Sequence, residues 1–204
     1  MLEVSISPRI ALEFKNCTTE DWLEWNIKGI QAELAGCAKY PEEAVALKAV
    51  DEQTGEIAGY AVWGWSARAA NLIIQDKADI ALPARTNTSL RQTFISRLTK
   101  VEEQFRPQGK HYELCQMTVS LRYQRRGIGS QLVKYGLDKA DRDTVTCFLT
   151  GSPMGVPVYQ KLGFEEVGSL EMDLKDFGGE GTHVHGECCT DRAWWSSSAA
   201  ANDA

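Results

Sequence analysis

The second half of the chain alternates between strand and helix patterns, and this alternation constrains the fold more than any other feature. Residues 112–119 (YELCQMTV) predict a strand, and residues 127–140 predict a helix with one apolar stripe. The nearly continuous apolar run TVTCFLT predicts a buried strand. PVYQKLGF then predicts a short helix ending at Gly163, and EEVGSLEMDL predicts a further strand. This order indicates an α/β fold with a partly parallel sheet.

The first half of the chain fits the same fold class. Residues 45–65 contain two β-rich runs around a Gln-Thr-Gly turn, which predicts a hairpin. Upstream, Thr18 or Thr19 is a suitable cap for an acidic helix start. Residues 66–111 read as an insertion between strands, with a helix from about 89 to 105. Because loops and short helices often set specificity, we expect this insertion to influence the choice of substrate.

Length and composition predict one ordinary globular domain. The 204 residues are 43% hydrophobic and 25% charged, which suits a single domain over residues 1–190. Residues 191–204 are expected to hold a last strand and a disordered tail of small polar residues. No segment approaches the ~18 apolar residues of a membrane span, and the N-terminus lacks a secretory pattern. We therefore expect a cytoplasmic protein without a membrane partner.

Charge and cysteine usage narrow the classes of partner. The net charge of −6 argues against nucleic acid as a partner, because binding to phosphates normally needs a basic face. The six cysteines contain no C-x-x-C pair and are expected to be reduced, with Cys115 and Cys147 inside strands. His183 and His185 lie near a vicinal cysteine pair, but we interpret this Gly-rich segment as a loop and expect no metal.

The stretch RYQRRGIGSQLV, residues 122–133, has the properties of an anion site. A strand, a short loop and a helix N-terminus direct unpaired backbone N–H groups at one point. Gly127 and Gly129 allow close approach because they have no Cβ, and Arg125 and Arg126 add positive charge. The pattern predicts a phosphate or pyrophosphate site, although a solvated surface turn fits the same residues. It is neither a Walker loop nor a complete dinucleotide fingerprint.

Two motifs resemble those of a known family. MTVSLRYQRRGIGSQLV closely resembles the acyl-CoA motif, Q/R-x-x-G-x-G/A after a strand, of the GNAT superfamily of N-acetyltransferases. Downstream, GSPMGVPVYQKLGF resembles that family's second motif, and its wording is most similar to fungal members. The resemblance covers residues 112–174 firmly and residues 45–65 more loosely. It implies the GNAT (acyl-CoA N-acyltransferase) fold, a mixed central sheet flanked by helices, with acetyl-CoA as cosubstrate and no metal.

The resemblance also implies which residues bind acetyl-CoA. Those that would wrap the pyrophosphate are Gln124, Arg125, Arg126, Gly127, Ile128, Gly129 and Ser130. Those that would pair with the pantetheine arm as if it were a strand are Met117, Thr118 and Val119. A backbone N–H near Val119 would face the thioester oxygen. Two positions depart from the family pattern: Ser152 replaces the frequent asparagine of the second motif, and Ser120-Leu121 replaces a His-Pro or Asp-Pro pair.

The catalytic candidates are a tyrosine and a glutamate. The resemblance makes Tyr159 the general acid for the departing thiolate, whereas the alternative is a tyrosine that only packs. Glu113 is the candidate base, alone or through a water, and a solvated strand-end glutamate is the alternative. Simple alternation places Glu113 on the face of Cys115, Met117 and Val119. A bulge in this strand would change that face.

These residues support one leading function and two alternatives. The leading prediction is direct transfer of the acetyl group of acetyl-CoA to the amine of a small molecule. A non-catalytic acyl-CoA-binding or interaction protein is one alternative. An acetyltransferase acting on a protein lysine or N-terminus is the other. The sequence leaves the acceptor open, and it is compatible with a homodimer.

Overall fold

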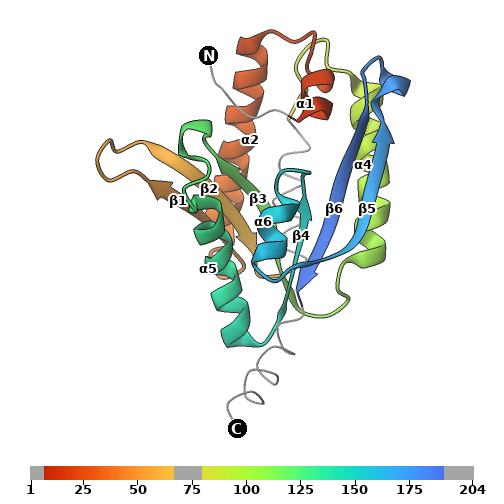
Figure 1. Ribbon diagram of the computed structural model, residues 1–204. Coiled ribbons are helices and arrows are strands. Elements are labelled where there is room, and N and C mark those ends of the chain that lie inside the picture. Colours follow the sequence, from red (N-terminus) through yellow and green to blue (C-terminus); the bar gives the residue numbers. More distant parts are fainter. Residues whose placement is uncertain (1–6, 67–79, 191–204) are drawn as a thin grey trace.

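The computed structural model describes residues 7–66 and 80–190, which form one mixed sheet with helices on both faces (Figure 1). The six described strands lie in the order β1-β2-β3-β4-β6-β5. Among the described pairs, only β3 and β4 run parallel. The predicted α/β class with a mixed, flanked sheet is therefore confirmed. The strands are β1 (Ala44–Val50), β2 (Ile57–Gly64), β3 (His111–Val119), β4 (Thr146–Gly151), β5 (Glu165–Asp173) and β6 (Thr182–Thr190).

The helices begin where the sequence supplies caps and good helix formers. The predicted cap of the long α2 is confirmed at Thr18, whose hydroxyl accepts a hydrogen bond from the Asp21 N–H at 3.1 Å. Asn87 caps α4 in the same way through the Leu90 N–H. The helices are α1 (Pro8–Glu13), α2 (Thr19–Lys39), α4 (Thr88–Phe105), α5 (Ile128–Asp143) and α6 (Val156–Lys161), with short 3₁₀ turns η1 (Leu121–Tyr123) and η2 (Leu174–Phe177).

The two faces of the sheet have separate cores. On the face covered by α5 and α6, Trp63 is fully buried and its indole N–H donates to the Leu132 carbonyl at 3.2 Å. On the opposite face, Val62 packs against Cys37 of α2, and Leu170 and Met172 of β5 pack against α4. Trp63 and Val62 are neighbours in β2, so the alternation of a strand assigns them to the two cores.

One predicted loop is wrong. Residues 182–190 form β6, which pairs antiparallel with both β4 and β5. His183, His185 and Glu187 alternate along the strand towards α4, and these polar residues hide the usual apolar signal of a buried strand. Both histidine rings contact Phe94 edge-on. The expected strand and tail at 191–204, and the part of the insertion at 67–79, lie outside the described residues.

The cysteines, the side chains that could bind a metal and the helices add three further observations. Cys115 and Cys147 lie in β3 and β4 as predicted, and neither forms a disulfide with another described cysteine. Within the described ranges, the side chains form no group of three or more that could hold a metal ion. Over the same ranges, none of the helices combines the length and the apolar character of a membrane span.

Candidate functional site

The parallel strands β3 and β4 separate halfway along β3. Their pairing runs from His111–Thr146 to Leu114–Leu149 and ends there. The other edge of β3 remains paired with β2 as far as Val119–Gly59. Within the described chain, the β4-facing backbone from Cys115 to Val119 therefore has no strand beside it. Such an open edge offers hydrogen-bonding groups to an extended ligand.

A bulge at Cys115 corrects the predicted face of Glu113. In the β2–β3 register, Trp63 pairs with Leu114 and Val62 pairs with Gln116, so Cys115 is the extra residue. Residues after the bulge change face relative to a simple alternation. Met117 and Val119 consequently pack with the α5-side core, whereas Glu113 lies on the face covered by α4. The expectation that Glu113 shares a face with Met117 and Val119 is wrong.

The turn between β3 and α5 has the conformation that the glycine motif suggests. Gly127 is the N-cap with φ 82°, and Arg125 also has a positive φ of 63°. No side chain of the described chain caps α5, so its first-turn N–H groups remain available to a ligand. A Cβ at Gly129 would lie 3.7 Å from Met117 and Val119. The structure therefore brings the glycine turn directly beside the end of the open strand.

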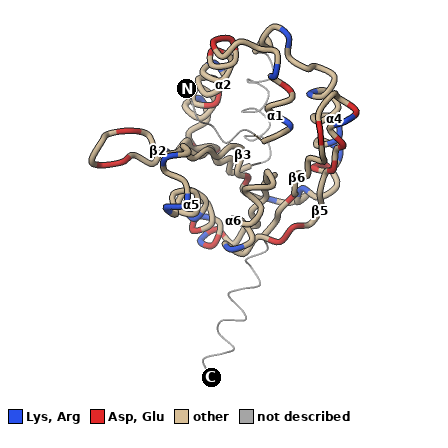
Figure 2. Tube along the Cα trace, turned by 45° about the horizontal axis from the view of Figure 1, so that its top comes forward, with Lys and Arg blue, Asp and Glu red and all other residues tan. Residues whose placement is uncertain are grey.

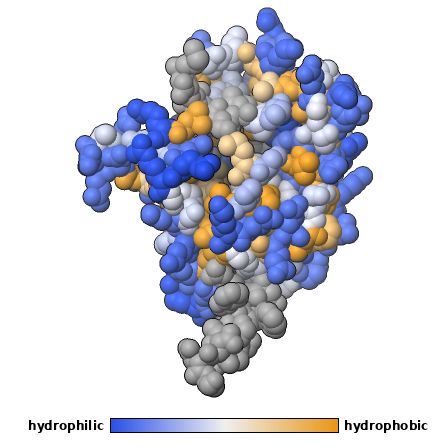
Figure 3. Space-filling model, in the orientation of Figure 1, coloured by the Kyte–Doolittle hydropathy of each residue, from blue (hydrophilic) through white to orange (hydrophobic). Residues whose placement is uncertain are grey.

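The polar side chains of this turn have different partners. Arg122 forms an ion pair of 2.7 Å with Glu56 and so ties the turn to the β1–β2 hairpin. The Gln124 amide donates to the Val119 carbonyl at 3.2 Å. Arg126 lies over the Tyr123 ring, and both Arg125 and Arg126 are exposed. Figure 2 shows acidic residues near the tip of the β1–β2 hairpin, which projects away from the sheet, and Figure 3 shows that this projecting part of the surface is hydrophilic.

Replacing Gly129 by alanine tests the anion site predicted at the glycine turn without disturbing the fold. The new methyl group would meet Met117 and Val119 only at ordinary van der Waals distance, 3.7 Å. It would, however, occupy the space in which an anion approaches the first-turn N–H groups. We expect roughly 10-fold weaker acetyl-CoA binding, about 1.4 kcal/mol, with an unchanged melting temperature. Titration calorimetry measures the affinity for acetyl-CoA. An unchanged affinity would contradict the prediction that an anion binds next to Gly129.

Tyr159 lies in α6 against the end of β4. Its ring packs against Gly151 and Gly155, where an added Cβ would approach ring atoms to 3.1 and 2.9 Å. The residue is 6% exposed, and Phe164 contacts its ring edge-on. Burial, with a smaller contribution from Cys188, raises the pKa of Tyr159 to about 12. The hydroxyl therefore stays protonated at neutral pH and is suited to donating a hydrogen bond.

Ser152 is used locally at the start of α6. Its hydroxyl accepts a hydrogen bond from the Gly155 N–H at 3.3 Å, and its carbonyl accepts one from the Val156 N–H at 3.0 Å. The hydroxyl proton remains available as a donor. Ser152 therefore shapes the loop that carries Tyr159 towards the end of β4.

A buried polar cluster was missed by the sequence reasoning. Arg106 Nη2 contacts Glu113 Oε1 at 3.2 Å and Glu102 Oε2 at 3.5 Å. Thr150 Oγ1 lies 3.1 Å from both Glu102 Oε1 and Glu187 Oε2. We call Glu102, Arg106, Glu113, Thr150 and Glu187 the Glu187 cluster. The period-two spacing of His183, His185 and Glu187 was the signal for a strand with a buried polar face.

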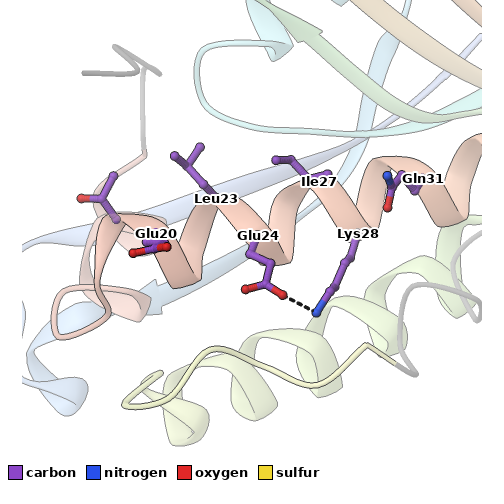
Figure 4. A pocket seen from close by; sticks show the side chains of 7 residues that line it. Glu20, Leu23, Glu24, Ile27, Lys28 and Gln31 are labelled. Carbon is purple, nitrogen blue, oxygen red and sulfur yellow. Dashed lines mark ion pairs between the residues drawn. The ribbon is translucent and has the colours of Figure 1, made fainter.

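A surface depression on α2 contains none of the residues predicted for the site. Its lining residues all belong to that one helix, and Figure 4 shows them along its outer face with the Glu24–Lys28 ion pair. The open edge of β3, the glycine turn and Tyr159 therefore remain the candidate site.

Comparison with known proteins gives several similarities. An acetyltransferase from Stachybotrys chartarum is 36% identical over 89 residues, which are 43% of this chain and 37% of that protein. The chain thus spans little more than a third of that relative. Arylalkylamine N-acetyltransferase 2 from Aedes aegypti is 17% identical, with a TM-score of 0.49, covering 78% of this chain and 77% of that one.

A further solved structure and a family model also match this chain. The crystal structure of histone acetyltransferase HPA2 and related acetyltransferase from Corynebacterium glutamicum is 19% identical, with a TM-score of 0.47, covering 89% of this chain and 87% of that one. Residues 101–173 match the family model described as an acetyltransferase (GNAT) domain. This span includes β3, the glycine turn, α5, β4 and α6. Residues 101–173 of this chain are therefore similar to the acetyltransferase domain of the GNAT family.

Proposed function

We propose that the protein transfers the acetyl group of acetyl-CoA directly to the amine of a small molecule. The observation that carries this proposal is the open edge of β3 from Cys115 to Val119, which leads from the glycine turn to the point where β4 rejoins the sheet. An anion-binding turn at one end and an unpaired strand edge along the way suit a long phosphate-bearing thioester.

The geometry supports a direction for the bound arm. With the phosphates at Gly127 beside Val119, the arm would run back along roughly 13 Å of open strand towards Cys115. Met117 and Thr118 would then pair with the arm. The thioester would reach the bulge rather than Val119, so the backbone donor for the developing oxyanion would come from Cys115 or Gln116. Bulges commonly redirect backbone groups near active sites.

Tyr159 would assist the leaving group from the other side of β4. Transferring its proton fully to a thiolate of ordinary pKa ~8.5 would be about 5 kcal/mol uphill. A hydrogen bond from the Tyr159 hydroxyl to the sulfur is therefore the favoured role as the C–S bond breaks. Glu113 remains a candidate for the base, together with a water. The family match supports acetyl transfer, and a cytoplasmic location remains a proposal.

The test is a thiol-release assay combined with a binding measurement. We expect acetyl-CoA to stabilise the protein in a thermal-shift titration. We further expect release of CoA with at least one class in a panel of polyamines, arylamines, amino acids, aminoglycosides and peptides. Absence of any stabilisation by acetyl-CoA would contradict the proposal. Binding without release across the panel would favour the non-catalytic alternative, and release only with peptides would favour a protein acceptor.

A further inference from the structure

The Glu187 cluster holds more negative charge than its neighbours neutralise. Its three carboxyl groups face one guanidinium, that of Arg106. His111 Nε2 lies 3.8 Å from Glu113 Oε2, and the neighbouring Glu113 carboxyl group is the main cause that raises the pKa of His111. Even with His111 protonated, three carboxylates would leave one negative charge without a cation. Glu113 and Glu187 are buried, whereas the Glu102 side chain is 18% exposed, and burial of this excess negative charge favours uptake of a proton or of a cationic ligand.

Thr150 lies between two of these carboxyl groups. Its hydroxyl has one hydrogen, yet its Oγ1 lies 3.1 Å from both Glu102 Oε1 and Glu187 Oε2. The hydroxyl can donate to only one of them. A proton on the other carboxyl would let that group donate to Oγ1 in turn. Glu102 and Glu187 are therefore placed to hold one proton between them.

Glu187 also has an oxygen that points to a missing partner. The residue is 0% exposed, and its Oε1 has no hydrogen-bond partner among the described residues. Glu113, 4% exposed, likewise has Oε2 without a hydrogen bond. The Arg106 Nε–H is also unpaired and could serve a polar group of the same ligand. A buried carboxylate oxygen without a donor is costly, and an ammonium group would supply the donor.

The cluster lies where the two strands separate. Thr150 is the first residue of β4 after its last pair with β3, and Thr150 faces Glu187 across the β4–β6 register. The next residue, Gly151, contacts Tyr159 on the other side of the sheet. A thioester held in the opening would therefore have Tyr159 on one side and the Glu187 cluster on the other.

We propose that the Glu187 cluster receives the ammonium group of the acceptor and that Glu187 accepts its proton. This inference rests on the function proposed above. The ammonium gives one proton to the Glu187 carboxylate, and the neutral nitrogen then forms the C–N bond as the C–S bond breaks. The second nitrogen proton balances the departing thiolate, which leaves as the thiol. The Glu187 proton returns to solvent, so the carboxylate is regenerated.

The electrostatic surroundings agree with this role. Burial first, and then the charge of Glu102, raise the pKa of Glu187 to about 8, against the opposing effects of the Thr150 hydrogen bond and Arg106. The groups that face it from the neighbouring elements are Glu102 and Arg106 of the α4 segment, Glu113 of β3 and Thr150 of β4. His185 is the next inward-facing residue of β6, and its own pKa is lowered to about 3, mainly by burial.

The Glu187→Gln variant tests the proposal, and Glu171→Gln is its control. Glu171 is an exposed glutamate on the neighbouring strand β5. Near neutral pH we expect Glu187→Gln to lower kcat/KM for the amine roughly 100-fold. Stabilisation by acetyl-CoA should stay unchanged, and the control should match the wild type. Equal kcat/KM in Glu187→Gln and wild type would overturn the inference while leaving the proposed function intact. Loss of acetyl transfer in the wild type would instead refute the proposed function.

The pH profile separates proton transfer from a structural role. In the wild type, kcat/KM should rise as Glu187 ionises and level off above a pH of about 8. The Glu187→Gln variant has no carboxylate to accept the ammonium proton, so only the neutral amine can react. Its kcat/KM should therefore keep rising towards the amine pKa of ~10. Identical profiles would overturn the inference.

A binding measurement covers the case in which Glu187→Gln folds poorly. In the presence of CoA, excess methylammonium chloride should raise the melting temperature of the wild type above that in sodium chloride of equal ionic strength. Thr150→Val, which removes the shared hydroxyl and keeps the side-chain shape, should reduce this rise and shift the pH profile. A wild type without the ammonium effect, or a Thr150→Val variant with the full effect and an unchanged profile, would contradict the proposal.

Discussion

Tyr159→Phe is expected to lower turnover roughly 10²- to 10³-fold while leaving acetyl-CoA binding within about twofold. The variant keeps the ring, and therefore its packing against Gly151, Gly155 and Phe164. It removes only the hydroxyl, whose high pKa keeps it a hydrogen-bond donor at neutral pH. The loss should appear in kcat and kcat/KM equally, because the hydrogen bond strengthens only as the sulfur becomes negative.

The matched control for this variant is Tyr135→Phe. Tyr135 lies on α5 and is 49% exposed, so its hydroxyl can be removed with little effect on folding or catalysis. Steady-state thiol release with the best acceptor of the panel gives kcat, and titration calorimetry gives the affinity for acetyl-CoA. If Tyr159→Phe turned over as fast as Tyr135→Phe, the Tyr159 hydroxyl would have no part in the reaction. Tyr159 would then contribute only packing.

Gly136→Ala is expected to destabilise the protein by about 2–4 kcal/mol. In an exposed helix this change would stabilise by up to ~1 kcal/mol. Here the new methyl carbon would come within 2.3–2.6 Å of the Trp63 ring. Trp63 cannot easily move away, because it is fully buried and its indole N–H is bonded to the Leu132 carbonyl. Helix α5 would therefore be pushed off the sheet.

Denaturant unfolding followed by tryptophan fluorescence measures this effect. The expected loss corresponds to a fall in melting temperature of roughly 5–12 °C for a chain of this size. Gly109→Ala is the control, because a Cβ at Gly109 meets nothing within 4 Å. A Gly136→Ala variant as stable as Gly109→Ala would show that α5 and Trp63 are not in the tight contact seen here. A displaced α5 should also weaken acetyl-CoA binding, since its N-terminus forms the glycine turn.

Several parts of this protein follow from local sequence. The caps, the Gln-Thr-Gly hairpin and the Gly-x-Gly helix start each depend on residues that are neighbours in the chain. For that reason α2, the β1–β2 hairpin, β3, α5, β4, α6 and β5 could all be predicted, together with the position of the glycine turn after β3. The anion-binding character of this turn stays a prediction. Strand β6 could not, because its buried face carries two histidines and a glutamate instead of apolar residues.

The arrangement of the site depended on contacts between distant segments. The bulge at Cys115 exists only in the pairing of β3 with β2, and it decides that Glu113 faces α4 and not Met117. The Glu187 cluster combines residues from α4, β3, β4 and β6 that are up to 85 positions apart in the chain. No local pattern encodes their convergence, because it follows from strand order and register.

The sequence by itself determined the α/β class, most of the elements and the glycine turn that resembles an acyl-CoA motif. These features depend on periodicity, helix capping and the conformational freedom of glycine, each of which involves only a few neighbouring residues. Only the tertiary structure decided where β3 and β4 separate, which face each β3 side chain takes and which carboxyl groups meet at Thr150. The physical reason is that burial and hydrogen-bond partners, which set the chemistry of a carboxyl group, are supplied by strands and helices remote in sequence.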